Sequence, residues 1–110
     1  ASELGEVYGD TAIAVISEFG RTAKENGNKG TDHGRGNAMW LLGGGIRGGR
    51  VYGRWPGLVE SQLYEKRDLQ VTTDFRDAIA TLLESHLNLG SDRIARVFPD
   101  YEFNLVKELT

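Results

Sequence analysis

The stretch TAIAVIS, residues 11–17, is the segment that decides the fold class. It is short, rich in β-branched residues and apolar on both faces, which is typical of a central strand covered on two sides. A central strand needs neighbours, and NAMWLLG, residues 37–43, is a second candidate for an apolar strand. The two stretches are therefore the candidate strands of a sheet.

The clearest helix is predicted at residues 73–87. Its apolar residues fall on one face at spacings of three and four, with Thr73 as the N-cap. The members of this stripe are Phe75, Ala78, Ile79, Leu82, Leu83 and Leu87. Gly90 closes this helix, and a shorter one is predicted at residues 92–97.

The glycine-rich segment 43–50 has two interpretations. Its backbone N–H groups could form an anion-binding nest, assisted by Arg47 and Arg50. We favour a tight connection between strands in which glycine supplies positive φ, because neither the dinucleotide spacing nor the P-loop spacing is present. Residues 51–55 then form a short strand, and brief extended pieces flank the charged turn at residues 65–67.

Length and composition limit the class of protein. The 110 residues suffice for one domain, residues 1–110, with a single core. The net charge of -3 offers no basic surplus for nucleic acid or an anionic membrane. The absence of cysteine excludes disulfides and thiolate metal sites. No apolar run approaches the roughly 20 residues of a membrane span. The sequence shows no signal-peptide pattern, and both a periplasmic and a cytoplasmic location stay open.

The loop SEFGRTAKENGNKGTDHGRGN, residues 17–37, gathers the groups that could perform chemistry and contains almost no apolar residue. Binding groups are often presented on such loops. A carboxylate at Glu18, the pair Asp32 and His33, and the guanidinium groups of Arg21 and Arg35 could bind a divalent metal and an oxyanion together. The alternative is that Asp32 and His33 make only turn and capping hydrogen bonds.

Oxygen donors and one imidazole suit zinc first, then Mn, Mg or Ca. The chain has only two histidines, so a multi-histidine zinc site within one copy is nearly excluded. The second histidine, His86, is interpreted as either a packed residue or a histidine at a helix C-terminus, rather than a ligand.

Several motifs occur in an order that resembles the C-terminal part of the DUF1501 family, over about residues 8–101. They are SEFGRT at 17–22, ENGN at 25–28, GTDHG at 30–34, GGGIRGGRVYG at 43–53 and VTTDFR at 71–76. The resemblance implies a relationship to the sulfatase and alkaline phosphatase superfamily. It further implies a fragment of an alkaline-phosphatase-like sheet, with Gly-rich loops, C-terminal helices and metal ligands at strand ends.

The superfamily's Asp-His-Gly metal motif can be carried over to this chain in two ways. Residues 17–20 follow an apolar strand as that motif does, but Phe19 replaces the histidine, so only Glu18 would be a ligand. Residues 31–34 keep the letters but follow a loop. Either way the implied metal ligands are Glu18, Asp32 and His33. The family's N-terminal part is not in this sequence, so the chain resembles a fragment of a larger α/β fold.

These observations predict a metal-dependent hydrolase-like domain that acts on small phosphate or sulfate esters. A metal-activated water is the expected nucleophile, and Arg21 or Arg35 would stabilise the developing oxyanion. The alternative is a non-catalytic metal-binding or structural fragment. A homo-oligomer is expected, because a strand edge and an apolar face that the rest of such a fold would cover tend to pair.

Overall fold

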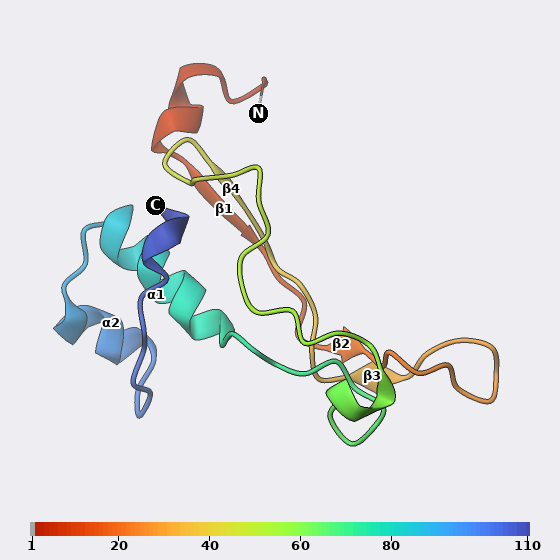
Figure 1. The fold of residues 1–110 in the computed structure, drawn as a ribbon. Coiled ribbons are helices and arrows are strands. Elements are labelled where there is room, and N and C mark those ends of the chain that lie inside the picture. The colour runs from red at the N-terminus through yellow and green to blue at the C-terminus, as the bar shows by residue number, and fades with distance from the viewer. Residues whose placement is uncertain (1) are drawn as a thin grey trace. The chain divides into compact units, whose positions relative to one another are not determined.

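The computed structural model describes residues 2–110 as helices and small antiparallel sheets, an α/β chain in the general sense (Figure 1). The chain forms two compact units. The first comprises residues 2–15, Trp40–Tyr52 and Asp74–Thr110, and the second comprises Ile16–Met39 and Gly53–Thr73. Each unit is described by itself below.

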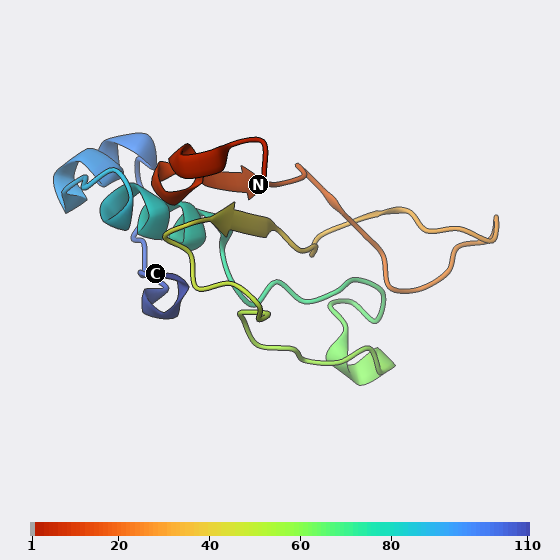
Figure 2. The same ribbon diagram turned by 90° about the horizontal axis from the view of Figure 1, so that it is seen from above.

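The first unit begins with the 3-10 helix η1, Gly5–Asp10. A two-stranded antiparallel ribbon follows it. Strand β1, Ala12–Val15, pairs with β4, Trp40–Gly43, and the two run side by side in Figures 1 and 2. Both predicted strands are therefore confirmed. The expected burial on two faces is wrong: Ile13 and Val15 on one face remain 39% and 50% exposed, and Ala14 on the other face is exposed as well.

One face of this ribbon is apolar and open. Register pairs Ile13 with Leu42 and Val15 with Trp40, and paired residues of an antiparallel sheet project from the same face. All four side chains are exposed, and Trp40 is 69% exposed.

Helix α1, Phe75–Ser85, is the main helix of the first unit. Its N-cap is Asp74 rather than the predicted Thr73: the carboxylate accepts a hydrogen bond from the backbone N–H of Arg76 at 2.9 Å. The guanidinium of Arg76 also donates to both oxygens of Asp74, at 2.9 and 2.8 Å. These hydrogen bonds lower the pKa of Asp74.

The apolar stripe of α1 is buried only in its middle. Ala78 and Leu82 are buried, whereas Phe75 and Leu87 at the two ends are 51% and 58% exposed. Leu87 lies beyond the last helical residue, Ser85, which is why it leaves the stripe.

The segment after residue 100 packs against α1 through three hydrogen bonds. Tyr101 Oη donates to Asp77 Oδ1 at 2.7 Å, and the N–H of Asn104 donates to the same oxygen at 2.8 Å. The N–H of Val106 donates to Thr81 Oγ1, also at 2.8 Å. Thr81 is consequently buried although it is polar.

Two further short helices complete the first unit. Helix α2, Ser91–Val97, begins where the sequence predicts it and packs against α1, with Ile94 completely buried. The 3-10 helix η3, Lys107–Leu109, buries Leu109. The Leu109 carbonyl accepts a hydrogen bond from the Arg47 N–H at 2.8 Å.

The glycine-rich segment forms turns, in which the N–H of Ile46 donates to the Gly43 carbonyl and that of Gly48 to the Ile46 carbonyl. Gly43 and Gly49 take positive φ as the favoured interpretation predicts, but the segment leads from β4 to no further strand within residues 2–110. The strand predicted at residues 51–55 is absent, and Val51 is 99% exposed. No regular partner strand lies beside these residues within the described chain, so their backbone has no ladder to join.

The second unit consists of a β-hairpin within Ile16–Met39 and an irregular segment, Gly53–Thr73. Strand β2, Gly20–Arg21, pairs with β3, His33–Gly34, and the 3-10 helix η2 covers Glu60–Gln62. The predicted extended pieces around residues 65–67 are confirmed by an antiparallel bridge between Tyr64 and Asp68.

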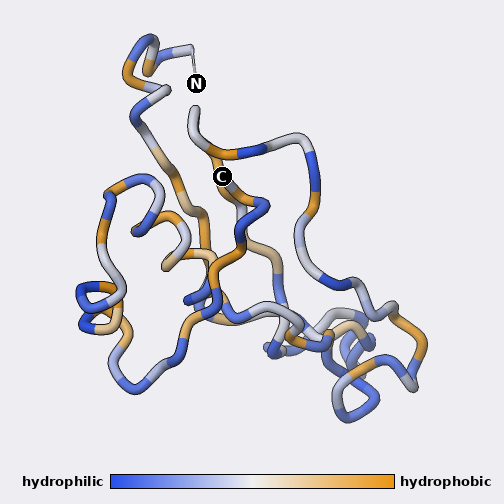
Figure 3. Tube along the Cα trace, turned by 60° about the vertical axis from the view of Figure 1, so that its left-hand side comes forward, coloured by the Kyte–Doolittle hydropathy of each residue, from blue (hydrophilic) through white to orange (hydrophobic). Residues whose placement is uncertain are grey.

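No helix within residues 2–110 is long and apolar enough to cross a membrane. The hydropathy trace agrees, because hydrophobic stretches are short and alternate with hydrophilic ones along the chain (Figure 3).

Replacing Asp68 should destabilise the second unit. Its carboxylate is 2% exposed and accepts the Arg35 N–H at 3.3 Å, so Asp68→Ala leaves a donor without its partner. We expect a loss of about 1–3 kcal/mol in the free energy of unfolding, measured with urea, and faster hydrogen exchange at the Arg35 amide. The exposed Asp92→Ala is the control. Unchanged exchange at Arg35 would contradict this account.

Tyr101 should make stability depend on alkaline pH. Partial burial and then the hydrogen bond to Asp77 raise the pKa of Tyr101 from 10.0 to about 12. The fold thus favours the neutral phenol, and this contribution is complete below pH 10 and lost as pH rises toward 12. Ultraviolet titration of the wild type should show a phenolate signal that forms near pH 12, and Tyr101→Phe should lack it. Between pH 10 and 12 the variant should also lose less stability than the wild type. A Tyr101→Phe titration still containing that signal would refute the assignment.

Candidate functional site

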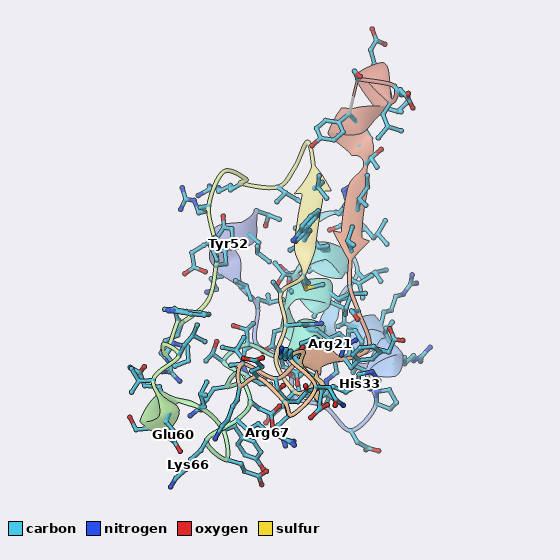
Figure 4. The ribbon with its side chains drawn as sticks, turned by 90° about the vertical axis from the view of Figure 1, so that its right-hand side faces the viewer. Arg21, His33, Tyr52, Glu60, Lys66 and Arg67 are labelled. Atoms are coloured by element: carbon cyan, nitrogen blue, oxygen red, sulfur yellow. The ribbon has the colours of Figure 1, made fainter. Side chains whose placement is uncertain are left out.

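The five candidate residues all belong to the second unit, on or beside the β2–β3 hairpin. Register places Arg21 of β2 directly opposite His33 of β3. Residues paired in this way project from the same face with their Cβ atoms about 5 Å apart. Figure 4 shows the two labelled side chains close to each other. The hairpin therefore presents a guanidinium and an imidazole together.

Arg21 is anchored at one nitrogen. Its Nη1 donates to the Thr31 carbonyl at 2.7 Å, which ties β2 to the residues just before β3. Arg21 is exposed, and the other N–H groups of its guanidinium have no acceptor among residues 2–110. A guanidinium carries five N–H donors in a planar fork, so most of them stay available to a ligand.

Asp32 lies on the other face of the hairpin. Thr22 and Asp32 extend the pairing by one residue beyond the end of β2 and before the start of β3. The Thr22 N–H donates to the Asp32 carbonyl at 3.0 Å, and the Asp32 N–H donates to Thr22 Oγ1 at 3.2 Å. Successive residues of an extended chain point in opposite directions. Asp32 and His33 thus diverge.

The carboxylate of Asp32 orders the loop between the strands. Asn26 Nδ2 donates to Asp32 Oδ1 at 2.9 Å. The carbonyl oxygen of the same Asn26 amide accepts the backbone N–H groups of Asn28 and Gly30 at 2.9 and 3.0 Å. For Asp32 the structure therefore gives the turn-stabilising hydrogen bond that was the alternative to metal binding.

The imidazole of His33 stacks on the ring of Phe19. The ring centroids are 4.0 Å apart and the planes are inclined by 23°. His33 remains exposed in spite of this contact.

Arg35 is held by two contacts from the loop at residues 64–68. Its guanidinium carbon lies 4.2 Å from the centroid of the Tyr64 ring, and its backbone N–H donates to Asp68 Oδ1. The other oxygen of Asp68 accepts from Arg67 Nη2 at 3.4 Å. Arg35 is thus a restrained cation at the end of the hairpin.

Sequence reasoning missed Asp68, a buried residue that helps to connect this loop to the hairpin. Gly34 permits the connection, because a Cβ there would lie 2.7 Å from Asp68 Oδ1. No periodic pattern or motif marks Asp68, so the only signal was its place beside a charged turn.

The predicted metal ligands do not form a complete site in one copy of the chain. Among residues 2–110 no group of three His, Asp or Glu side chains is arranged to hold a metal ion. Glu18 is exposed, and the alternation of side chains along the paired strand directs Asp32 and His33 to opposite faces. These residues therefore do not fit a metal ion without further donors.

The comparisons with known proteins give a family but no function. A family model described as "Protein of unknown function (DUF1501)" matches residues 1–98. Neither the curated proteins nor the solved structures gave a match. Because the matched residues are most of the chain, and the motifs at residues 17–53 lie within them, this chain belongs to the DUF1501 family.

Proposed function

We propose that this chain is part of a metal-dependent hydrolase acting on phosphate or sulfate esters, and that the β2–β3 hairpin contacts the anionic ester group. The observation that carries the proposal is the shared face of Arg21 and His33, given by their register. A guanidinium and an imidazole on one exposed face can both donate hydrogen bonds to a phosphate or sulfate group.

Arg35 extends the same chemistry. Stacking on Tyr64 restrains its side chain, so less conformational entropy is lost when the guanidinium contacts an anion. Restrained donors directed at a developing negative charge make a large contribution to catalysis of ester hydrolysis. In the proposed enzyme, Arg21 and Arg35 therefore stabilise the oxyanion that develops during ester hydrolysis.

The metal-dependent part of the proposal needs donors beyond one copy of this chain. Asp32, His33 and the following Gly34 resemble the Asp-His-Gly motif of the sulfatase and alkaline phosphatase superfamily, which is why a metal, zinc first, is proposed. A homo-oligomer would bring a second set of Glu18, Asp32 and His33. The open apolar face of the β1–β4 ribbon supports association.

A non-catalytic anion-binding module is the second candidate function. One observation favours it: three metal donors do not converge among residues 2–110, whereas the cationic groups of the hairpin need no metal to bind an anion. The experiments below separate the two candidates.

Arg21→Ala should weaken binding of inorganic sulfate by about tenfold or more, because hydrogen bonds to a charged group contribute about 1.5–3 kcal/mol. Isothermal titration calorimetry measures the affinity. Lys24→Ala removes the same charge from the neighbouring loop and should change the affinity little. If turnover of a phosphate or sulfate ester is found, Arg21→Ala should reduce it by about a hundredfold. Equal sulfate affinity in both variants would argue against the anion site.

His33→Ala should lower the zinc content of the purified protein, while His86→Ala, which alters the only other histidine, should leave it unchanged. Zinc is measured after dialysis, and light scattering gives the mass with and without zinc. If a second copy completes the coordination, zinc should increase the mass in wild type but not in His33→Ala. Equal zinc content in the two variants would remove the metal from the proposal and leave the anion-binding module.

A further inference from the structure

The stacked pair Phe19 and His33 has a consequence for the imidazole. A face-to-face contact, here at 4.0 Å, covers one side of a ring and leaves its edge uncovered. Both nitrogens of an imidazole lie on that edge. The stack therefore restrains the plane of the ring without occupying the atoms that would bind a ligand.

The backbone that carries Phe19 is itself held in place. Asn37 Nδ2 donates to the Phe19 carbonyl at 3.0 Å and to the Ser17 carbonyl at 3.4 Å. The next residue, Gly20, packs against Gly36 so closely that a Cβ would collide with the Gly36 carbonyl oxygen. The backbone on either side of Phe19 is thus held, by the Asn37 amide and by the contact between Gly20 and Gly36.

Core packing does not account for this arrangement. Phe19 stays 37% exposed and His33 is exposed as well, so the pair removes little apolar surface from water. What the contact does achieve is an orientation of the imidazole on the face that also carries Arg21.

We propose that Phe19 is a positioning residue that orients the His33 imidazole, so that this ring and the Arg21 guanidinium contact the same phosphate or sulfate group. The inference rests on the proposed function, because it concerns the same anion site. Phe19 acts through His33 and does not itself touch the anion.

The experiment follows the imidazole signals by NMR at one fixed pH while inorganic phosphate is added. His86, in the first unit, is an internal reference in every spectrum. Phe19→Leu removes the aromatic ring, Phe19→Tyr keeps it, and Phe75→Leu is a matched control at another exposed phenylalanine. In wild type we expect an upfield-shifted His33 signal, caused by the Phe19 ring, and a change at His33 but not at His86 on addition of phosphate.

Phe19→Leu should remove the upfield shift and weaken phosphate binding by about twofold to tenfold, the range expected for an aromatic pair. Phe19→Tyr should restore both, and Phe75→Leu should alter neither. Loss of the shift with unchanged affinity, or an unchanged His33 signal in Phe19→Leu, would overturn the positioning role alone. If phosphate fails to move the His33 signal in wild type, and Arg21→Ala binds as well as wild type, the proposed function fails instead.

Discussion

The second unit depends on the hydrogen bonds accepted by the buried carboxylate of Asp68. One of its oxygens accepts the backbone N–H of Arg35, and the other accepts from the guanidinium of Arg67. Removing a carboxylate from water costs several kcal/mol unless such donors replace the solvent. The same contact brings Tyr64 beneath Arg35 and requires glycine at position 34. A structural residue far along the sequence thereby determines where a candidate ligand-binding cation lies.

Local signals in the sequence located the regular elements well. The apolar stretches at residues 11–17 and 37–43 correspond to β1 and β4, and the stripe at 73–87 corresponds to α1. Burial could not be predicted equally well, because it depends on how many neighbours an element acquires. The stretch TAIAVIS has the composition of a covered strand, yet Ile13, Ala14 and Val15 are exposed in β1, so neither face is covered within residues 2–110. The covering of Thr81 by the chain near Val106 depends on a contact 25 positions away, which no periodicity reveals.

For the candidate site, the sequence identified the correct loop but not the directions of its side chains. Arg21 and His33 meet because register, not spacing, places them opposite each other. Asp32 and His33 are adjacent in sequence and diverge because the chain is extended there. Phe19, noted from the motif only as a replacement for histidine, contacts the histidine 14 positions later in the chain. Membership of the DUF1501 family agrees with the motifs but brings no activity with it.

The segment that covers α1 lies beyond the residues that the family model matches. The family match ends at residue 98, whereas the groups that satisfy Asp77 and Thr81 come from Tyr101, Asn104 and Val106. A boundary drawn from the family match would therefore cut through a folded unit. It would leave a carboxylate and a hydroxyl on the helix without the hydrogen-bond donors that residues 101–106 provide. The physical limit of the domain is set by hydrogen bonding, and it extends beyond the limit set by sequence similarity.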